Sequence, residues 1–119
     1  MRVLIVDDSR LARMTLRKAL PPDLTADVVE AADGDEALRY VEANHIDLMF
    51  LDLTMPGRDG YQVLKSLQDS GRMLPTIVVS ADIQALAAER VMKLGAIAFV
   101  KKTLKPTDIT DVLQRAGLR

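Results

Sequence analysis

The sequence predicts an α/β fold built on a doubly wound parallel sheet, and two observations lead to that prediction. Five short apolar segments rich in β-branched residues alternate along the 119-residue chain with five segments of helical period. Residues 48–51 are apolar throughout and are followed by Asp52, Pro56 and Gly57. A short run that is apolar on both faces and closed by turn residues is typical of a central parallel strand. We therefore expect a five-stranded parallel sheet with five helices, folded as one domain over residues 1–119.

The expected strands cover approximately residues 2–6, 27–31, 48–52, 76–79 and 97–100. The segments between and after them carry apolar residues three or four positions apart, which places these residues on one face of a helix. Ser9 and Asp82 are suited to cap the first and fourth helices, and Pro106 is suited to the first turn of the last one. The residues expected to face the core are Ala12, Leu16, Ala19 and Leu20 in the first helix, Ala37, Leu38 and Val41 in the second, Val63, Leu64 and Leu67 in the third, Ile83, Leu86, Ala87, Val91 and Leu94 in the fourth, and Ile109, Val112, Leu113 and Ala116 in the fifth.

Charge and composition exclude several classes of function. Lys and Arg number 16 and Asp and Glu 17, for a net charge of −1, so the basic excess typical of direct binding to nucleic acid or anionic membranes is missing. The chain has no cysteine and only one histidine, His45, so a structural zinc site has no ligand set. Any bound metal is expected to be a hard cation held by oxygen. Because no signal peptide or membrane-spanning stretch is evident, we expect a cytoplasmic location.

Polar residues stand where four of the expected strands end. Asp7 and Asp8 follow the first strand, Asp52 ends the third, Ser80 follows the fourth, and a lysine pair at 101–102 follows the fifth. The carboxyl ends of parallel strands meet at one edge of the sheet, and ligands of open α/β sheets bind there. We therefore expect these side chains to lie close together.

Three neighbouring carboxylates repel one another, so the pKa of at least one of them is expected to be raised. A divalent cation that prefers oxygen, such as Mg²⁺, relieves this repulsion and also binds phosphate oxygens. A lysine and a hydroxyl nearby supply a positive charge and a hydrogen-bond donor for the same oxygens. This combination predicts a site at which an aspartate is phosphorylated. The alternative is that Asp52 only stabilises the turn that follows it.

Several short motifs occur together along the chain: the acidic pair 7–8, Asp52 followed by residues 54–57 and Gly60, Val79-Ser80-Ala81, and Gly95-Ala96 leading to Phe99-Val100 and a lysine. Together they resemble the receiver domains of response regulators in two-component signal transduction. The resemblance covers the whole chain and implies the flavodoxin-like, CheY-like strand order 2-1-3-4-5.

By this resemblance, Asp52 is the phosphoacceptor and receives its phosphoryl group from a phosphohistidine on a sensor histidine kinase or phosphotransfer protein. Asp8 is expected to ligate Mg²⁺ directly and Asp7 largely through water. Asp52 and the backbone carbonyl of Thr54 complete the protein ligands. The resemblance implies a signalling switch that catalyses its own phosphorylation and dephosphorylation, rather than an enzyme that acts on a separate substrate.

The resemblance also implies how the switch is read. Ser80 is expected to move to the phosphoryl oxygen, and Phe99, at the position of the family's switch aromatic, to rotate inward. The helix over 83–94, the fifth strand and the last helix would then bind an unknown downstream protein. The chain is expected to be a free-standing regulator or the N-terminal receiver of a longer one. The basic residues of the first helix, Arg10, Arg13, Arg17 and Lys18, are expected to form a solvated face, and the resemblance offers the alternative that this helix meets the kinase.

Two lysines are candidates for the family's phosphate-binding lysine. In the family this lysine lies seven residues after the glycine of the Gly-Ala pair, and counting from Gly95 gives Lys102 rather than Lys101. Family members usually continue with a proline in a cis peptide, whereas Thr103 follows here. A cis bond before a residue other than proline costs about 2.5 to 4 kcal/mol, so the bond between Lys102 and Thr103 is expected to be trans.

Three other functions remain open at this point. A phosphatase of the haloacid dehalogenase type also uses an aspartate and Mg²⁺, but it needs a second Asp two residues on, where this chain has Thr54. A flavodoxin shares the fold, but Asp7 and Asp8 would repel the phosphate that its first loop receives. A receiver that serves only as an interaction module would never be phosphorylated.

Overall fold

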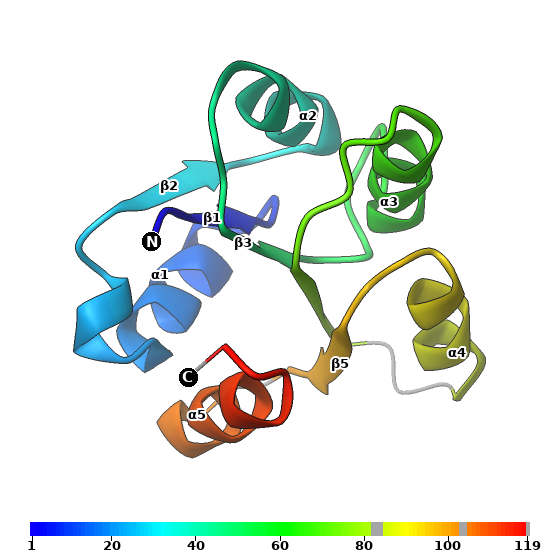
Figure 1. Cartoon of the computed structure of the whole chain (residues 1–119). Helices are drawn as coiled ribbons and strands as arrows, with labels where there is room; N and C mark the ends of the chain where they lie inside the picture. Colours follow the sequence, from blue (N-terminus) through cyan, green and yellow to red (C-terminus); the bar gives the residue numbers. More distant parts are fainter. Residues whose placement is uncertain (82–84, 103–104, 119) are drawn as a thin grey trace.

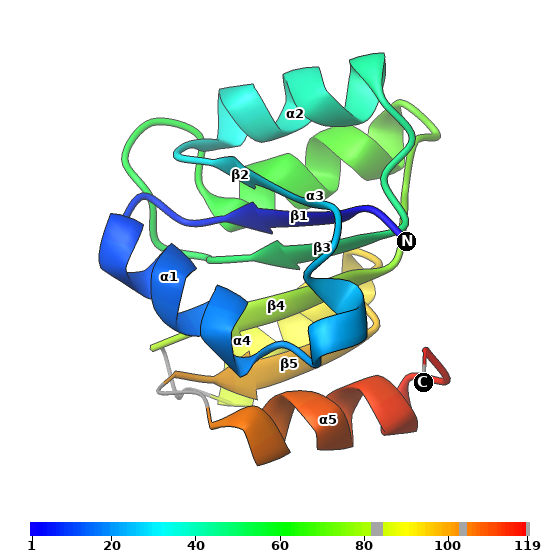
Figure 2. The same cartoon turned by 90° about the vertical axis from the view of Figure 1, so that its left-hand side faces the viewer.

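Within the residues that the computed structural model describes, 1–81, 85–102 and 105–118, five parallel strands form one sheet (Figure 1). The strand order is β2-β1-β3-β4-β5, which confirms the expected order. Figure 2 shows the strands in this order from top to bottom. The strands are β1 (Val3–Val6), β2 (Val28–Ala31), β3 (Leu48–Leu51), β4 (Thr76–Ser80) and β5 (Ala98–Lys101).

Helices follow the strands and cover both faces of the sheet. In Figure 1, α1 and α5 lie on one face, and α2, α3 and α4 lie on the other. The helices are α1 (Arg10–Ala19), α2 (Gly34–Ala43), α3 (Gly60–Asp69), α4 (Ala85–Lys93) and α5 (Pro106–Arg115), and a short 3₁₀ helix, η1 (Pro22–Leu24), follows α1.

The sheet divides the core into two layers because successive residues of a strand point to opposite faces. Ile5 and Phe50 pack with residues of α1 and α5, while Leu4 and Met49 pack with residues of α2, α3 and α4. Every residue of β1, β3 and β4 is buried. This two-sided burial explains why residues 48–51 are apolar without alternation.

Helix α4 differs from the sequence prediction. Leu86 is expected to face the core, but it is 73% exposed, whereas Ala87 and Val91 are buried. Successive helical residues point about 100° apart, so the orientation that buries Ala87 turns Leu86 toward solvent. The expectations that Ile83 faces the core and that Asp82 caps this helix fall outside the described residues.

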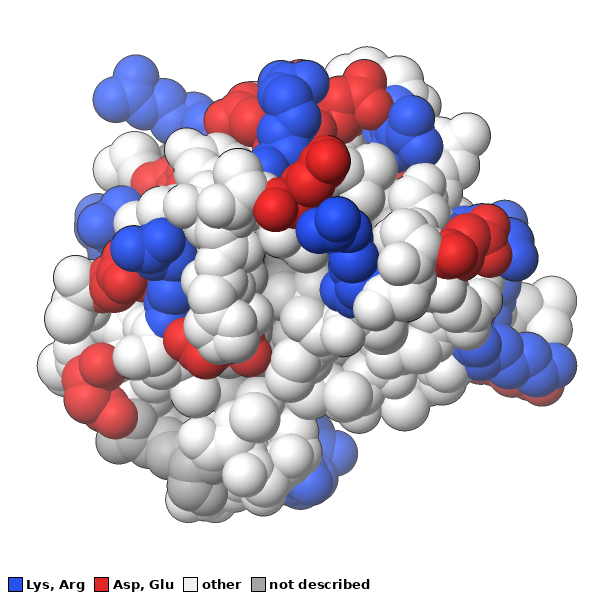
Figure 3. All heavy atoms as spheres, turned by 45° about the horizontal axis from the view of Figure 1, so that its top comes forward, with Lys and Arg blue, Asp and Glu red and all other residues white. Residues whose placement is uncertain are grey.

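The surface carries charges of both signs. On the face shown in Figure 3, acidic and basic side chains are interleaved and separated by uncharged areas, in keeping with the net charge of −1. Exposed ion pairs such as Lys65 with Asp69, at 3.0 Å, belong to this pattern. None of the helices described here has the length and apolar character needed to cross a membrane.

Candidate phosphorylation site

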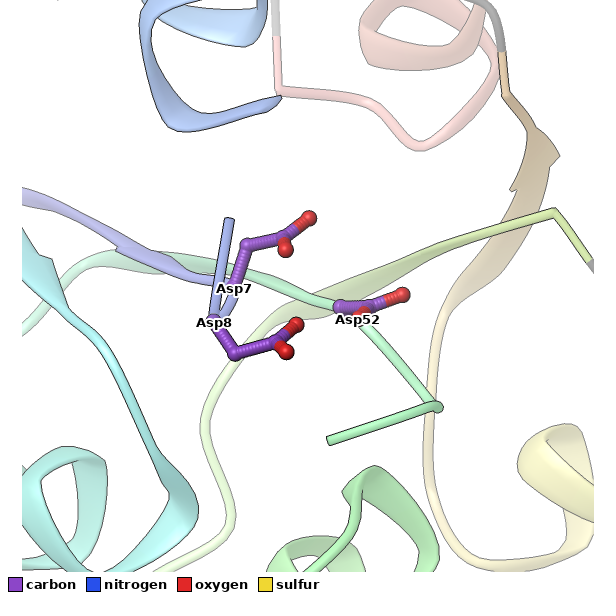
Figure 4. Close-up of side chains that lie close together, drawn as sticks. All are labelled: Asp7, Asp8 and Asp52. Atoms are coloured by element: carbon purple, nitrogen blue, oxygen red, sulfur yellow. The ribbon is translucent and has the colours of Figure 1, made fainter. Parts of the chain in front are cut away.

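Three aspartates from neighbouring strands form an acidic cluster at the carboxyl edge of the sheet (Figure 4). Asp7 and Asp8 follow β1 and Asp52 follows β3, and each offers a carboxylate oxygen within 4.8 Å of the others. The two strands are paired with Val6 opposite Leu51, so the residues that follow them emerge side by side. Three carboxylate oxygens at this spacing are a donor set that suits Mg²⁺.

Asp7 is held firmly in this cluster. Its N–H donates to the carbonyl of Ala31 at 3.1 Å, its Oδ1 accepts the N–H of Ser9 at 2.9 Å, and its Oδ2 accepts from Lys102 Nζ at 2.7 Å. It is 6% exposed, whereas Asp8 is exposed to solvent. The two adjacent acids therefore differ, because Asp7 is fixed by the fold and Asp8 is open to an incoming ligand.

Asp52 is buried and its carboxyl group is hard to ionise. Its N–H donates to the carbonyl of Val6 at 2.9 Å, and the residue is 5% exposed. Burial, and then the charge of Asp7, raise the pKa of Asp52 to about 6, while Lys102 and a backbone hydrogen bond from Thr54 act in the opposite direction. This confirms the expectation that one carboxyl of the cluster has a raised pKa. With this pKa, roughly nine-tenths of Asp52 is ionised at pH 7.

Lys102 bridges the two buried carboxylates. Its Nζ lies 2.7 Å from Oδ2 of Asp7 and 3.4 Å from Oδ1 of Asp52. Lys101, the last residue of β5, is exposed, so counting from Gly95 selects the lysine that the fold brings to the cluster. Burial alone would lower the pKa of Lys102, but the hydrogen bond to Asp7 and the charges of both aspartates raise it overall. Lys102 is therefore charged at neutral pH and offsets part of the repulsion.

Ser80 lies on β4, the neighbour of β3, and Phe99 lies on β5, one strand further from the cluster. Ser80 is fully buried and ends β4, one residue beyond the expected end of that strand. Its carbonyl accepts the N–H of Lys102 at 2.9 Å, which joins the ends of β4 and β5. Phe99 is opposite Val78 and packs, partly buried, against the core layer that includes α4 residues. The peptide bond between Lys102 and Thr103 lies outside the described residues.

The start of α3 packs closely against the end of β3. The N–H of Gly60 donates to the carbonyl of Leu53 at 3.0 Å. A Cβ at position 60 would collide with the carbonyl oxygen of Asp52 and would lie 2.8 Å from the Cα of Leu53. Glycine is required here because the backbone carrying Asp52 approaches so closely.

A cavity of about 230 Å³ lies beside the cluster, between α1 and the sheet. Its walls are largely apolar and include Ile5, Leu16, Phe50 and Val79, with Asp52 also part of the lining. Asp7 and Lys102 complete the lining beside Asp52, so the charged groups of the cluster stand at one end of an otherwise largely apolar cavity.

One contact to the acidic loop was not expected from the sequence. Arg13 does not belong to a solvated face, because its Nη1 donates to the carbonyl of Asp7 at 2.6 Å and its Nε donates to Glu30 at 2.8 Å. The sequence holds a faint signal for this contact. Arg13 lies one turn after the helix cap Ser9, and Glu30 is the only charged residue of β2.

Residues 3–114 match the response regulator receiver domain family. The chain belongs to this family. Receiver domains function in two-component systems, where they interact with histidine kinases or phosphotransfer proteins, so the phosphatase and flavodoxin alternatives are set aside.

Curated relatives and solved structures agree with this assignment. This receiver is 35% identical to the transcriptional regulatory protein PdtaR of Mycobacterium tuberculosis over 99% of its length and 30% identical to the nitrate/nitrite response regulator NarL of Escherichia coli over 97%. These alignments cover 57% and 54% of the two relatives, so the chain spans about half the length of the curated relatives it matches.

Two solved structures illustrate the shared fold. A receiver protein from Pseudomonas putida is 31% identical, with a TM-score of 0.84 over 97% of this chain and 98% of that one. The CheX–CheY–BeF₃–Mg²⁺ complex from Borrelia burgdorferi provides a match at 27% identity, with a TM-score of 0.87 over 100% of this chain and 90% of that one.

Proposed function

We propose that this receiver is switched by phosphorylation of Asp52, with the phosphohistidine of a sensor histidine kinase or phosphotransfer protein as donor. The observation that carries the proposal is the meeting of three carboxylates with the Nζ of Lys102, which lies 2.7 Å from Asp7 and 3.4 Å from Asp52. A receiver that served only as an interaction module would not need a buried, largely ionised aspartate beside a lysine and two further acids.

Phosphorylation and dephosphorylation of Asp52 are both nucleophilic displacements at phosphorus. A carboxylate oxygen of Asp52 forms a bond to phosphorus while the P–N bond to the donor histidine breaks and its electron pair stays on the imidazole nitrogen. In dephosphorylation a water oxygen attacks phosphorus, and the bond between phosphorus and the Asp52 oxygen breaks with its electron pair staying on the carboxylate. The phosphate that leaves carries both protons of the water and then exchanges them with solvent. The receiver catalyses both steps itself.

The residues around Asp52 prepare the site for this transfer. Asp8 would hold Mg²⁺ directly and Asp7 largely through water, with Asp52 and the carbonyl of Thr54 as the other protein ligands. When bound, Mg²⁺ neutralises charge that develops on the phosphoryl oxygens. Lys102 exchanges its contact with Asp52 for a charge-assisted hydrogen bond to a phosphoryl oxygen. The exposure of Asp8 and the position of Lys102 support these roles.

Phosphorylation is read out on the side of β4 and β5. The hydroxyl of Ser80 moves to the phosphoryl oxygen, and Phe99 turns inward into the space that this movement frees. The surface formed by the 83–94 segment, β5 and α5 then changes its affinity for a downstream protein in the cytoplasm. Support comes from the place of Ser80 at the end of β4, where its carbonyl is bound to the N–H of Lys102.

The direct test is phosphorylation by a small donor. Incubation with acetyl phosphate and Mg²⁺ should add one phosphoryl group to the wild-type protein, detected by intact mass spectrometry, and the Asp52→Asn variant should stay unmodified. A wild-type protein that is never modified would be an interaction module, and labelling of Asp52→Asn at the wild-type rate would move the acceptor elsewhere.

Two matched controls sharpen this test. Asp47→Asn changes the aspartate at the other end of β3 and should be labelled like the wild type. Lys102→Ala should slow labelling or uncouple it from partner binding, whereas Lys101→Ala should leave labelling unchanged because Lys101 is exposed to solvent and only Lys102 contacts the two buried carboxylates. A damaging Lys101→Ala beside a silent Lys102→Ala would reverse the assignment of the two lysines.

A further inference from the structure

Arg13 of α1 is joined to the main chain of the acidic loop. Its Nη1 donates to the carbonyl oxygen of Asp7 at 2.6 Å, and its Nε donates to Oε1 of Glu30 on β2 at 2.8 Å. Only 15% of the Arg13 side chain is exposed. A guanidinium group is planar and presents its donors in fixed directions, so the two acceptors are held in a fixed relation to each other.

The carbonyl that Arg13 holds belongs to the peptide unit between Asp7 and Asp8. The carbonyl oxygen of Asp7 and the N–H of Asp8 lie in one rigid plane. A hydrogen bond that fixes the carbonyl therefore fixes this plane and restricts the direction in which the Asp8 side chain leaves the backbone. The peptide on the other side of Asp8 is held by the hydrogen bond from the Ser9 N–H to Oδ1 of Asp7, and Arg13 supplies the restraint on the Asp7 side.

We propose that Arg13 is a positioning residue for the metal-binding loop. By holding the Asp7–Asp8 peptide against Glu30, it directs the carboxylate of Asp8 toward Asp7 and Asp52. This inference rests on the proposed Mg²⁺ site and extends it to a residue that is not a ligand. Groups that orient metal ligands typically change metal affinity about 10- to 100-fold, and we expect the lower figure because Arg13 acts through the main chain.

Charge alone predicts the opposite effect. Arg13 is a cation near a site for a cation, so its removal would reduce repulsion and tighten Mg²⁺ binding if it had no positioning role. The direction of the change in affinity therefore separates the two roles. Arg17 provides a matched control, since it stands one turn later on α1 and bonds the other carboxylate oxygen of Glu30 at 3.1 Å.

The test measures Mg²⁺ binding by isothermal titration calorimetry on the wild-type chain and on the two variants. Arg13→Gln should raise the Kd for Mg²⁺ about tenfold, while Arg17→Gln should leave it unchanged or slightly lower. A second measurement needs no metal. In EDTA, the amide hydrogen of Ser9, which donates to Oδ1 of Asp7 at 2.9 Å, should exchange faster with solvent in Arg13→Gln than in the wild type or in Arg17→Gln.

Each outcome is decisive. If the wild type binds Mg²⁺ and Arg13→Gln binds it equally well or more tightly, the positioning role is wrong and the proposed function stands. Weaker binding without faster exchange at Ser9 also contradicts the role, because the loop would not have been held by Arg13. A wild-type protein that binds no Mg²⁺ contradicts the proposed metal site itself. Should Arg13→Gln fail to fold, Arg13→Lys keeps the charge without the planar group and is expected to weaken binding in the same way.

Discussion

Two aspartates flank β3, Asp47 before its first residue and Asp52 after its last. The surroundings of Asp47 favour the ionised carboxylate, whereas those of Asp52 disfavour it. The carboxylate of Asp47 accepts the N–H of Arg2 at 2.6 Å and lies 2.8 Å from Nε2 of His45. The hydrogen bond from Arg2, and then the one with His45, lower the pKa of Asp47. Asp52 is buried beside another carboxylate, and its pKa is raised to about 6.

The comparison separates a structural carboxylate from a functional one. Asp47 is a half-buried ion whose partners favour its charge, so it helps to fix the start of the strand. Ionised Asp52 destabilises the folded state, because folding raises its pKa from 3.8 to about 6. Each pKa unit corresponds to about 1.4 kcal/mol, so ionised Asp52 opposes folding by roughly 3 kcal/mol at neutral pH. Strongly perturbed carboxyl groups of this kind are typical of functional sites.

The largest effect is expected from Asp52→Asn. At neutral pH in EDTA, this variant should be more stable than the wild type by about 2 kcal/mol, somewhat less than the full cost because Lys102 loses one partner. The gain should shrink as the pH falls from about 6 toward 3.8, because the folded wild type then binds the proton that its unfolded chain lacks. Urea denaturation of both proteins across this pH range measures it. If Asp52→Asn were less stable than the wild type at neutral pH, ionised Asp52 would stabilise the folded state as Asp47 does, and the contrast between the two aspartates would be wrong.

A smaller effect is expected from Mg²⁺. At the proposed site the ion would bind the folded cluster and hardly bind dispersed carboxylates, so at ten times its Kd it should stabilise the fold by about 1.4 kcal/mol. For a domain of this size that corresponds to a rise in Tm of about 4 °C or more. Thermal melts in EDTA and in Mg²⁺ should show this rise for the wild type and for Asp47→Asn, and a reduced rise for Asp52→Asn. Equal responses of all three proteins would place the metal away from Asp52.

The smallest effect is expected from Asp47→Asn. This variant should be slightly less stable than the wild type at neutral pH, because it replaces an ion whose charge the fold favours. The contribution of Asp47 is present above the pKa of 3.8 of the unfolded chain and is lost as the pH falls below it, so the two proteins should converge in acid. The same urea titrations measure the difference. If Asp47→Asn were more stable than the wild type, ionised Asp47, like ionised Asp52, would destabilise the folded state.

The place of the site could be predicted because its residues stand directly after apolar runs. Asp7 and Asp52 each follow a buried strand, and a parallel sheet brings such positions to one edge whatever the connecting helices contain. Lys102 could be predicted only by counting from Gly95 within a family pattern, since the sequence offers an equally charged neighbour at Lys101.

Features that depend on packing between distant segments could not be predicted. The apolar pattern of α4 predicts that both Leu86 and Ala87 face the core, and the fit against the sheet buries only Ala87. In the sequence, nothing distinguishes Arg13 from the other basic residues of α1. Its acceptors are a backbone carbonyl and a glutamate on β2, which only the folded chain brings to it. Repulsion between carboxylates was foreseen as the cause of a raised pKa, whereas burial of Asp52 proves to be the larger cause.

The hydrogen bond between Lys102 and Asp7 joins residues 95 positions apart in the chain, which determines when the site comes into existence during synthesis. The ribosome synthesises the acidic residues long before the lysine, and until β5 has docked the carboxylates lack their ion pairs with Lys102. A copy in which β5 has not docked lacks the contact between Lys102 and Asp7, so the cluster is complete only where the first and fifth strands share one sheet. The assembly of the cluster is thereby tied to the completion of the fold.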